Sequence, residues 1–254
     1  MRRMTEKRLY GTVLLKAKKI LDFISNLETA PTLKEISTGV EISKPTVLKI
    51  LQTLEYCGFV RSVGTEKQYY LGSIFIKYGD KTTKSFDISN IAMPFLNELR
   101  DKTTEAVNLG ILENNQIILL NRAKSSNSIR FDLELGGSMN MYSSAMGKAL
   151  LSTYSEEQLN HYLDQTALTP LTKSTFTNRE DLLKELTQIK QQGYAVDNIE
   201  NQDGIYCIGF PLIKNDHIFG AFSISAPVFR VDNDKVNKWI ELGMETQKKI
   251  LAHF

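Results

Sequence analysis

The stretch that most constrains the fold is Ser43–Tyr56, SKPTVLKILQTLEY, because its apolar residues recur with the period of a helix. Positions i, i+3, i+4 and i+7 are aliphatic and fall on one stripe: Val47, Ile50, Leu51 and Leu54. Ser43 is a suitable N-cap, and Pro45 is tolerated in the first turn, where its missing N–H costs nothing. The opposite side carries polar and basic residues such as Thr46 and Lys49. Such a helix suits either a DNA major groove or an ordinary protein surface.

The flanking residues favour the DNA groove. A first helix is expected over Gly11–Ser25, and Thr32-Leu33-Lys34-Glu35 is a capping box that opens a short second helix ending near Gly39. After the Ser43 helix, Phe59–Val63 and Lys67–Leu71 are expected to pair as a hairpin with a polar, basic tip. Three short helices followed by a hairpin predict a winged helix-turn-helix.

The charge of the chain is unevenly distributed. Its formal net charge is +2, but residues 1–84 carry 15 Lys and Arg against 8 Asp and Glu, whereas residues 85–254 carry 16 against 21. A basic first third joined to an acidic remainder indicates one module that meets a polyanion and one that does not. The same excess of basic residues would also occur on a merely solvated surface.

Composition excludes several classes of protein. The 254 residues contain two cysteines, Cys57 and Cys207, too far apart in sequence to form a disulfide framework, so a reducing, cytoplasmic setting is expected. The three histidines have no metal-ligand spacing, and no cofactor-binding motif is present, so neither a metal nor a cofactor is expected. Without a long apolar run, no membrane partner is expected either.

The second part of the chain is expected to hold an antiparallel sheet with helices. Ala106–Leu112 and Ile117–Ala123 form one predicted hairpin, and Ser128–Leu135 is a further strand candidate. Ile205–Ile213 and Ile218–Ala226 form the last hairpin. Amphipathic helices precede, separate and follow these strands, so the chain as a whole is predicted to be α+β.

Two features of this second part could line a ligand pocket. The segment GGSMNMYSSAMGKALL leads into a helix starting near Ser144, whose free N–H groups could hold an anion or a hydroxyl. It is not a phosphate-binding loop, because Tyr142 and Ala149 stand where that motif needs a glycine and a serine or threonine. Ser223 and Ser225 are two residues apart on a strand and share one face, which could face either a pocket or water.

Over essentially its whole length, the chain resembles the IclR family of bacterial transcriptional regulators. The matching strings, in the family's order, are SKPTVLKILQTLEYCGFV, YYLG, DISNIAMPFLNEL, GGSMNMYSSAMGKALL, GYAVDNIENQDGIYCIGFP and GAFSISAP. The resemblance implies a winged helix-turn-helix domain over residues 1–72, a linker helix over 73–85 and a GAF-like effector-binding domain over 86–254. It also implies a homodimer or homotetramer on a double-stranded DNA operator, and a small organic acid as effector.

The resemblance also implies site residues. Those expected at DNA are Ser43, Lys44, Pro45, Thr46, Lys49, Arg61 and Lys67. Those expected at the effector are Ala145, Met146, Asp197, Cys207, Ser223 and Ser225. The chain departs from the family pattern at Asn140 and Tyr142, which replace a Pro-x-His unit, and at Lys49, which replaces an arginine. Since lysine lacks the bidentate fork of arginine, Lys49 is expected to hold a phosphate rather than to read guanine.

The leading hypothesis is a ligand-responsive DNA-binding regulator, expected to be a repressor, whose operator binding is modulated by a small organic acid such as a sugar acid. One alternative is a winged-helix enzyme such as a methyltransferase, but the strands arrive as hairpins without a GxGxxG string, so no catalysis is expected. The other is a ligand-free interaction protein, which would have a filled core where the pocket is expected.

Overall fold

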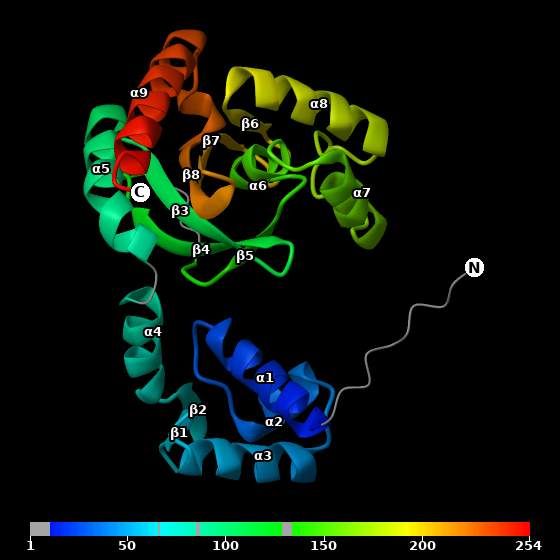
Figure 1. The fold of residues 1–254 in the computed structure, drawn as a ribbon. Coiled ribbons are helices and arrows are strands. Elements are labelled where there is room, and N and C mark those ends of the chain that lie inside the picture. Colours follow the sequence, from blue (N-terminus) through cyan, green and yellow to red (C-terminus); the bar gives the residue numbers. More distant parts are fainter. Residues whose placement is uncertain (1–10, 66, 85–86, 129–133) are drawn as a thin grey trace. The chain divides into compact units, whose positions relative to one another are not determined.

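A computed structural model describes residues 11–65, 67–84, 87–128 and 134–254. The chain divides into two compact units, Met1–Thr83 and Lys84–Phe254. Figure 1 shows the elements of each unit. The first unit is mainly helical with a two-stranded sheet, and the second surrounds a six-stranded sheet with helices, so the α+β class is confirmed.

The first unit is a winged helix-turn-helix. Its elements are α1 (Thr12–Ser25), α2 (Leu33–Gly39), α3 (Lys44–Tyr56), β1 (Val60–Val63), β2 (Gln68–Leu71) and α4 (Ile74–Lys84). The predicted capping box opens α2, where the Thr32 hydroxyl accepts from the Glu35 N–H and the Glu35 carboxylate accepts from the Thr32 N–H. The antiparallel pair β1–β2 is the wing.

The apolar stripe of α3 faces the core of this unit, as its spacing predicts. Val47 and Leu51 are fully buried, and Ile50 and Leu54 are 7% exposed. They pack with Ile20 of α1 and with residues of α2 and both strands. Burying an aliphatic side chain contributes about 1.5–3 kcal/mol, so this stripe fixes which face of α3 turns outward.

The second unit is built on one antiparallel sheet. Its strands are β3 (Ala106–Glu113), β4 (Gln116–Ala123), β5 (Ser138–Asn140), β6 (Ala195–Asn198), β7 (Ile205–Lys214) and β8 (His217–Pro227). They lie in the order β5-β4-β3-β8-β7-β6. The predicted hairpin β3–β4 turns through Asn114 and Asn115, both with positive φ, which matches the right-handed twist of the strands.

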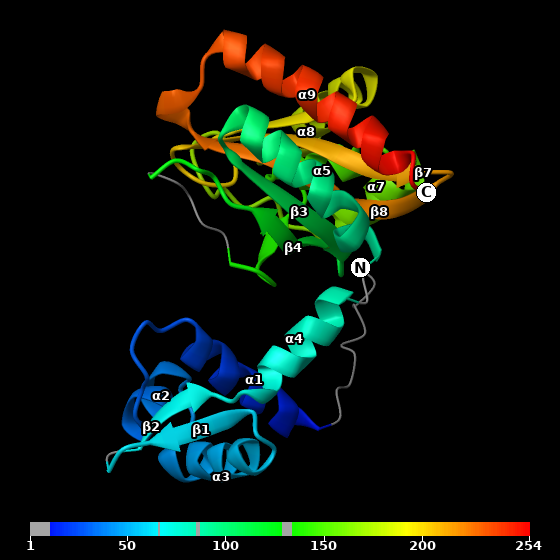
Figure 2. The same ribbon diagram turned by 90° about the vertical axis from the view of Figure 1, so that its left-hand side faces the viewer.

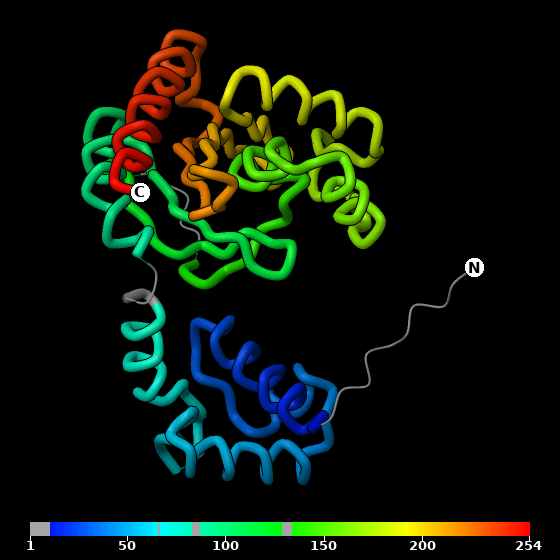
Figure 3. The backbone as a smooth tube through the Cα atoms, viewed as in Figure 1, coloured from blue at the N-terminus to red at the C-terminus, as the bar shows by residue number. Residues whose placement is uncertain are grey.

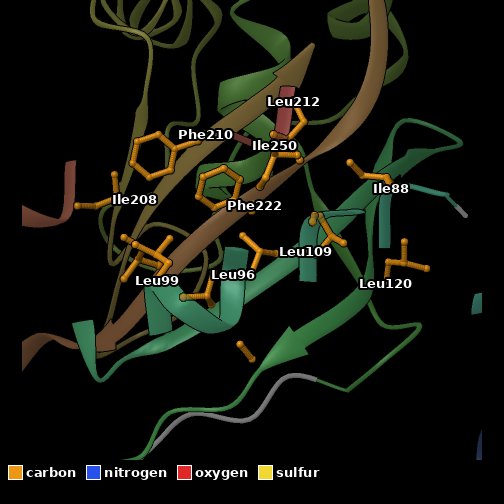
Figure 4. Packing of buried hydrophobic residues seen from close by; sticks show 14 of the residues in the cluster. Ile88, Leu96, Leu99, Leu109, Leu120, Ile208, Phe210, Leu212, Phe222 and Ile250 are labelled. Atoms are coloured by element: carbon orange, nitrogen blue, oxygen red, sulfur yellow. The ribbon is translucent and has the colours of Figure 1, made fainter. Parts of the chain in front are cut away.

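Helices cover both faces of this sheet, as the two views in Figures 1 and 2 show. They are α5 (Asp87–Thr103), α6 (Ala145–Leu151), α7 (Glu156–Gln165), α8 (Arg179–Gln192) and α9 (Asn233–Leu251), with a short 3-10 turn at Val228–Arg230. The helices α5 and α9 pack together on one face, where Phe210, Phe222 and Leu96 centre the larger core (Figure 4). The opposite face receives α6, with α8 packed behind it.

The strand expected at Ser128–Leu135 falls largely on residues 129–133, which lie outside the described part of the chain; the strand that pairs with β4 is β5 at Ser138–Asn140. Helix α5 continues through Pro94, although a proline inside a helix usually bends or interrupts it. Asn97 donates its side-chain N–H to the Met93 carbonyl in the turn around this proline.

Candidate functional site

The outward face of α3 carries the predicted DNA-binding residues. Ser43, Lys44, Pro45 and Lys49 are exposed, and Thr46 is half-buried. Ser43 occupies the N-cap position, as predicted; its hydroxyl lies 2.9 Å from that of Thr46 and makes no capping bond to the helix backbone. The two hydroxyls therefore satisfy one another at the start of the helix.

The wing supplies the other two predicted residues. The Arg61 guanidinium lies 4.4 Å from the centre of the Tyr70 ring, a cation–π contact across the hairpin that restricts the arginine. Lys67 is exposed near the tip of the wing. The Glu55 carboxylate accepts from the Ser62 hydroxyl at 2.7 Å and from its N–H at 3.1 Å, which ties the end of α3 to the wing.

The six residues predicted to hold an effector line one cavity in the second unit. The remaining lining residues are Met139, Ser144, Asn201, Gln202 and Ile205. The volume is about 30 Å3, room for about two water molecules. None of these lining residues is Lys or Arg, and Asp197 is the carboxylate among them. The cavity is therefore small, has three serines among its lining residues and carries no cation in its wall.

A glycine lets the start of α6 lie directly against the sheet beside this cavity. A Cβ on Gly209 of β7 would lie 2.4–2.7 Å from the backbone of Ala145 and Met146, which is too close for any side chain. Figure 3 traces how residues 145–151 come to lie against residues 205–214, which follow much later in the sequence. Ala145 and Met146 begin α6, so their N–H groups have no acceptor within the helix.

A hydrogen-bonded polar cluster lies on the sheet face below α6. The Asn108 amide donates to the Ser225 hydroxyl at 3.0 Å, and that hydroxyl lies 3.1 Å from the Cys207 sulfur and 3.4 Å from the Ser223 hydroxyl. Burial raises the pKa of Cys207, so the thiol stays protonated and unreactive. The sequence prediction missed Asn108. The sequence feature that could have identified Asn108 is its position as a polar residue in the middle of the apolar strand AVNLGIL.

The Asp197 carboxylate lines the cavity and also accepts hydrogen bonds from backbone N–H groups of the loop that follows it. One of its carboxylate oxygens accepts from the N–H groups of Glu200 at 2.7 Å and of Asn201 at 3.2 Å. Burial raises the pKa of Asp197 to about 6, although these two donors and the more distant Lys148 lower it. The carboxylate therefore shapes the loop that carries Asn201, and it titrates within a mildly acidic range.

Behind the cavity wall lies a buried ion pair that the sequence prediction missed. Lys148 of α6 is fully buried, and its ammonium group donates to both Glu200 oxygens at 2.6 and 2.7 Å and to Glu185 of α8 at 3.2 Å. The ring of Phe176 lies 5.0 Å from the ammonium nitrogen. Burial raises the pKa of Glu200, and the ammonium opposes that rise. A lysine among the small and apolar residues of SSAMGKALL was the available signal.

No group of three or more His, Cys, Asp and Glu side chains that could hold a metal ion occurs in the described segments. No helix within those segments is both long and apolar enough to cross a membrane.

A winged helix-turn-helix and a sheet domain with a small cavity, joined in one chain, are the architecture of a two-domain DNA-binding regulator. A family model described as bacterial transcriptional regulator IclR C-terminal matches residues 80–251, and another described as IclR helix-turn-helix domain matches residues 13–64. The chain belongs to the IclR family of transcriptional regulators. It is therefore a DNA-binding regulator and not the winged-helix enzyme of the alternative hypothesis, because both family models are those of transcriptional regulators.

Individual relatives agree with this assignment. The chain is 27% identical over 241 residues to the transcriptional repressor IclR of Escherichia coli K12, covering 93% of this chain and 88% of the relative. It is 31% identical to the crystal structure of the Thermotoga maritima IclR, with a TM-score of 0.80 over 96% of this chain and 99% of that one. An IclR homologue of Microbacterium hydrocarbonoxydans, complexed with 4-hydroxybenzoate, shares the fold at 18% identity, with a TM-score of 0.79 over 94% and 97% of the two chains.

Proposed function

We propose that this regulator is a repressor whose binding to a double-stranded DNA operator is modulated by a small organic acid held in the cavity of the second unit. Residues 1–72 would form the DNA-binding domain, 73–85 the linker helix and 86–254 the effector-binding domain. The observation that carries the proposal is that all six effector residues, drawn from α6, β6, β7 and β8, line one cavity. The repressor name of one relative and the organic acid bound to another support it.

The cavity offers complementary chemistry to a hydroxylated acid. The N–H groups of Ala145 and Met146 and the hydroxyls of Ser223 and Ser225 can donate to a carboxylate. Asp197 can accept from a ligand hydroxyl. Since the volume of about 30 Å3 admits little more than two water molecules, a larger ligand such as a sugar acid requires wall residues to move. Met139 and Met146 are the flexible members of that wall.

A thermal-shift screen of short oxo acids, hydroxy acids and sugar acids tests this proposal. The fluorescence of Trp239, the one tryptophan of the chain, reports unfolding of the second unit because it lies buried in α9. A ligand at a hundred times its dissociation constant adds about 2.7 kcal/mol of stability. The matched control is Ser223→Ala, which removes one donor from the cavity and should reduce the shift. A panel in which no acid shifts the transition favours the ligand-free interaction protein. An equal shift in wild type and Ser223→Ala means that the acid binds without this hydroxyl, which refutes the proposed site.

On the DNA side, we expect the exposed cations to contact phosphates. Replacing Lys49 with alanine should weaken binding to all sequences alike and reduce the magnitude of the slope of log K against log salt by about 1. Affinity measurements at several salt concentrations on two unrelated duplexes test this. If Lys49→Ala instead changes the preferred base at one position and leaves the salt slope intact, Lys49 reads a base.

A second copy of the chain is the expected partner of an apolar groove on the first unit. The groove has a volume of about 440 Å3 and is lined by α1, the end of α3, β2 and the start of α4, including Leu21, Leu54 and Phe75. Leu14 at its edge is 71% exposed. A dimer would cover this surface and present two recognition helices to operator half-sites about 34 Å apart. Analytical ultracentrifugation of Leu14→Glu should show loss of the dimer, or loss of the tetramer if dimers pair in the wild type. An unchanged sedimentation coefficient places the dimer contact elsewhere.

A further inference from the structure

Gln52 is an exposed side chain on α3. Its amide has no hydrogen-bond partner among the described residues. The neighbouring polar groups are engaged within the chain: the Thr53 hydroxyl donates to the Lys49 carbonyl at 3.1 Å, and Glu55 accepts from Ser62. Gln52 is therefore the amide of α3 whose donor and acceptor are both available to a partner.

Helix geometry places Gln52 near the middle of the outward face. At about 100° per residue, Gln52 lies about 20° from Pro45 and about 60° from Lys49 around the helix axis. The centre of the buried stripe that contains Val47 and Leu51 lies on the opposite side. A recognition helix placed in a major groove with its core face turned away from the DNA therefore directs Gln52 at the base edges.

We infer that Gln52 reads an adenine in each operator half-site, an inference that rests on α3 being the recognition helix. The glutamine amide has one donor and one acceptor, which match the N7 acceptor and the N6 donor of adenine in the major groove. Lys49 carries donors alone, and the Arg61 guanidinium is stacked on Tyr70, so neither duplicates this pattern. Leu48 is 37% exposed, about 40° from Gln52 around the axis, where it can contact a thymine methyl group.

The test is selection of duplexes from a random-sequence library by the full-length protein, compared among wild type and two variants. Wild type should select a motif containing an A·T pair that Gln52→Ala no longer prefers; the lost discrimination should be about 5- to 150-fold. Gln52→Glu should move the preference at that pair toward cytosine, whose N4 amine donates to a carboxylate. Thr53→Ala is the matched control, because that hydroxyl already bonds within the helix, and its motif should match wild type.

The salt dependence separates base reading from general attraction. Gln52→Ala should keep the wild-type salt slope, since the side chain carries no charge. A wild-type motif that persists unchanged in Gln52→Ala overturns the assignment while leaving the regulator function intact, and so does a uniform loss of affinity at every position. If wild type selects no sequence at all, the proposed operator binding by α3 and the Gln52 assignment fall together.

Discussion

Replacing Asp197 with asparagine should change how the stability of the second unit depends on pH. Asparagine keeps an oxygen that can accept from the Glu200 and Asn201 N–H groups, so the loop should keep its shape. What it removes is a buried carboxylate whose pKa is raised by burial to about 6 from an ordinary 3.8. The variant therefore isolates the free-energy cost of ionising that group inside the protein.

The direction in which stability changes with pH follows from the number of protons that the folded and unfolded states bind. Because the folded-state pKa is above the unfolded value, the folded protein binds more protons across this range, and its stability falls as pH rises through it. The stabilising contribution is fully present below about pH 4 and is lost above about pH 6. A shift from 3.8 to about 6 corresponds to about 3 kcal/mol in total, of which about 2 kcal/mol falls between pH 4.5 and pH 7.

Thermal unfolding followed by Trp239 fluorescence measures the effect in the intact chain. For a domain of this size, about 2 kcal/mol corresponds to roughly 4–8 °C. The melting temperature of Asp197→Asn, taken relative to wild type, should therefore rise by that amount between pH 4.5 and pH 7. A difference that stays constant over this range, or that shrinks, refutes the buried and easily protonated state of Asp197.

Two further predictions concern the structure around the cavity. Glu200→Gln should lower the free energy of unfolding by about 3–5 kcal/mol, because it leaves the fully buried Lys148 with Glu185 as its remaining carboxylate. Urea unfolding at pH 7 measures this change. A loss below about 1 kcal/mol would mean that the ion pair is open to water. Gly209→Ala should cost about 1–3 kcal/mol or more and should weaken any effector found in the screen, because its Cβ displaces the start of α6. The control Gly79→Ala meets no atom within 4 Å; because it lies inside α4, it should raise stability by about 0.5–1 kcal/mol and leave effector binding unchanged.

Local sequence patterns determined the winged helix and the first hairpin of the second unit. The spacing of Val47 to Leu54 sets the buried side of α3, the Thr32–Glu35 box starts α2, and the paired asparagines at 114 and 115 turn the β3–β4 hairpin. Each of these patterns acts between residues a few positions apart, where helix and strand periods are fixed by backbone geometry. The same reasoning placed Ser223 and Ser225 on one strand face, and the structure buries both.

The tertiary structure alone decided what the second unit encloses. Lys148 and Glu200 are 52 residues apart, and the contact between Gly209 and the start of α6 joins segments still farther apart in sequence. The volume of the cavity and the second role of Asp197 as an acceptor for its own loop depend on such contacts. Periodicity gives the direction of a side chain from its strand or helix, whereas volume, burial and pKa depend on which other segments pack against it.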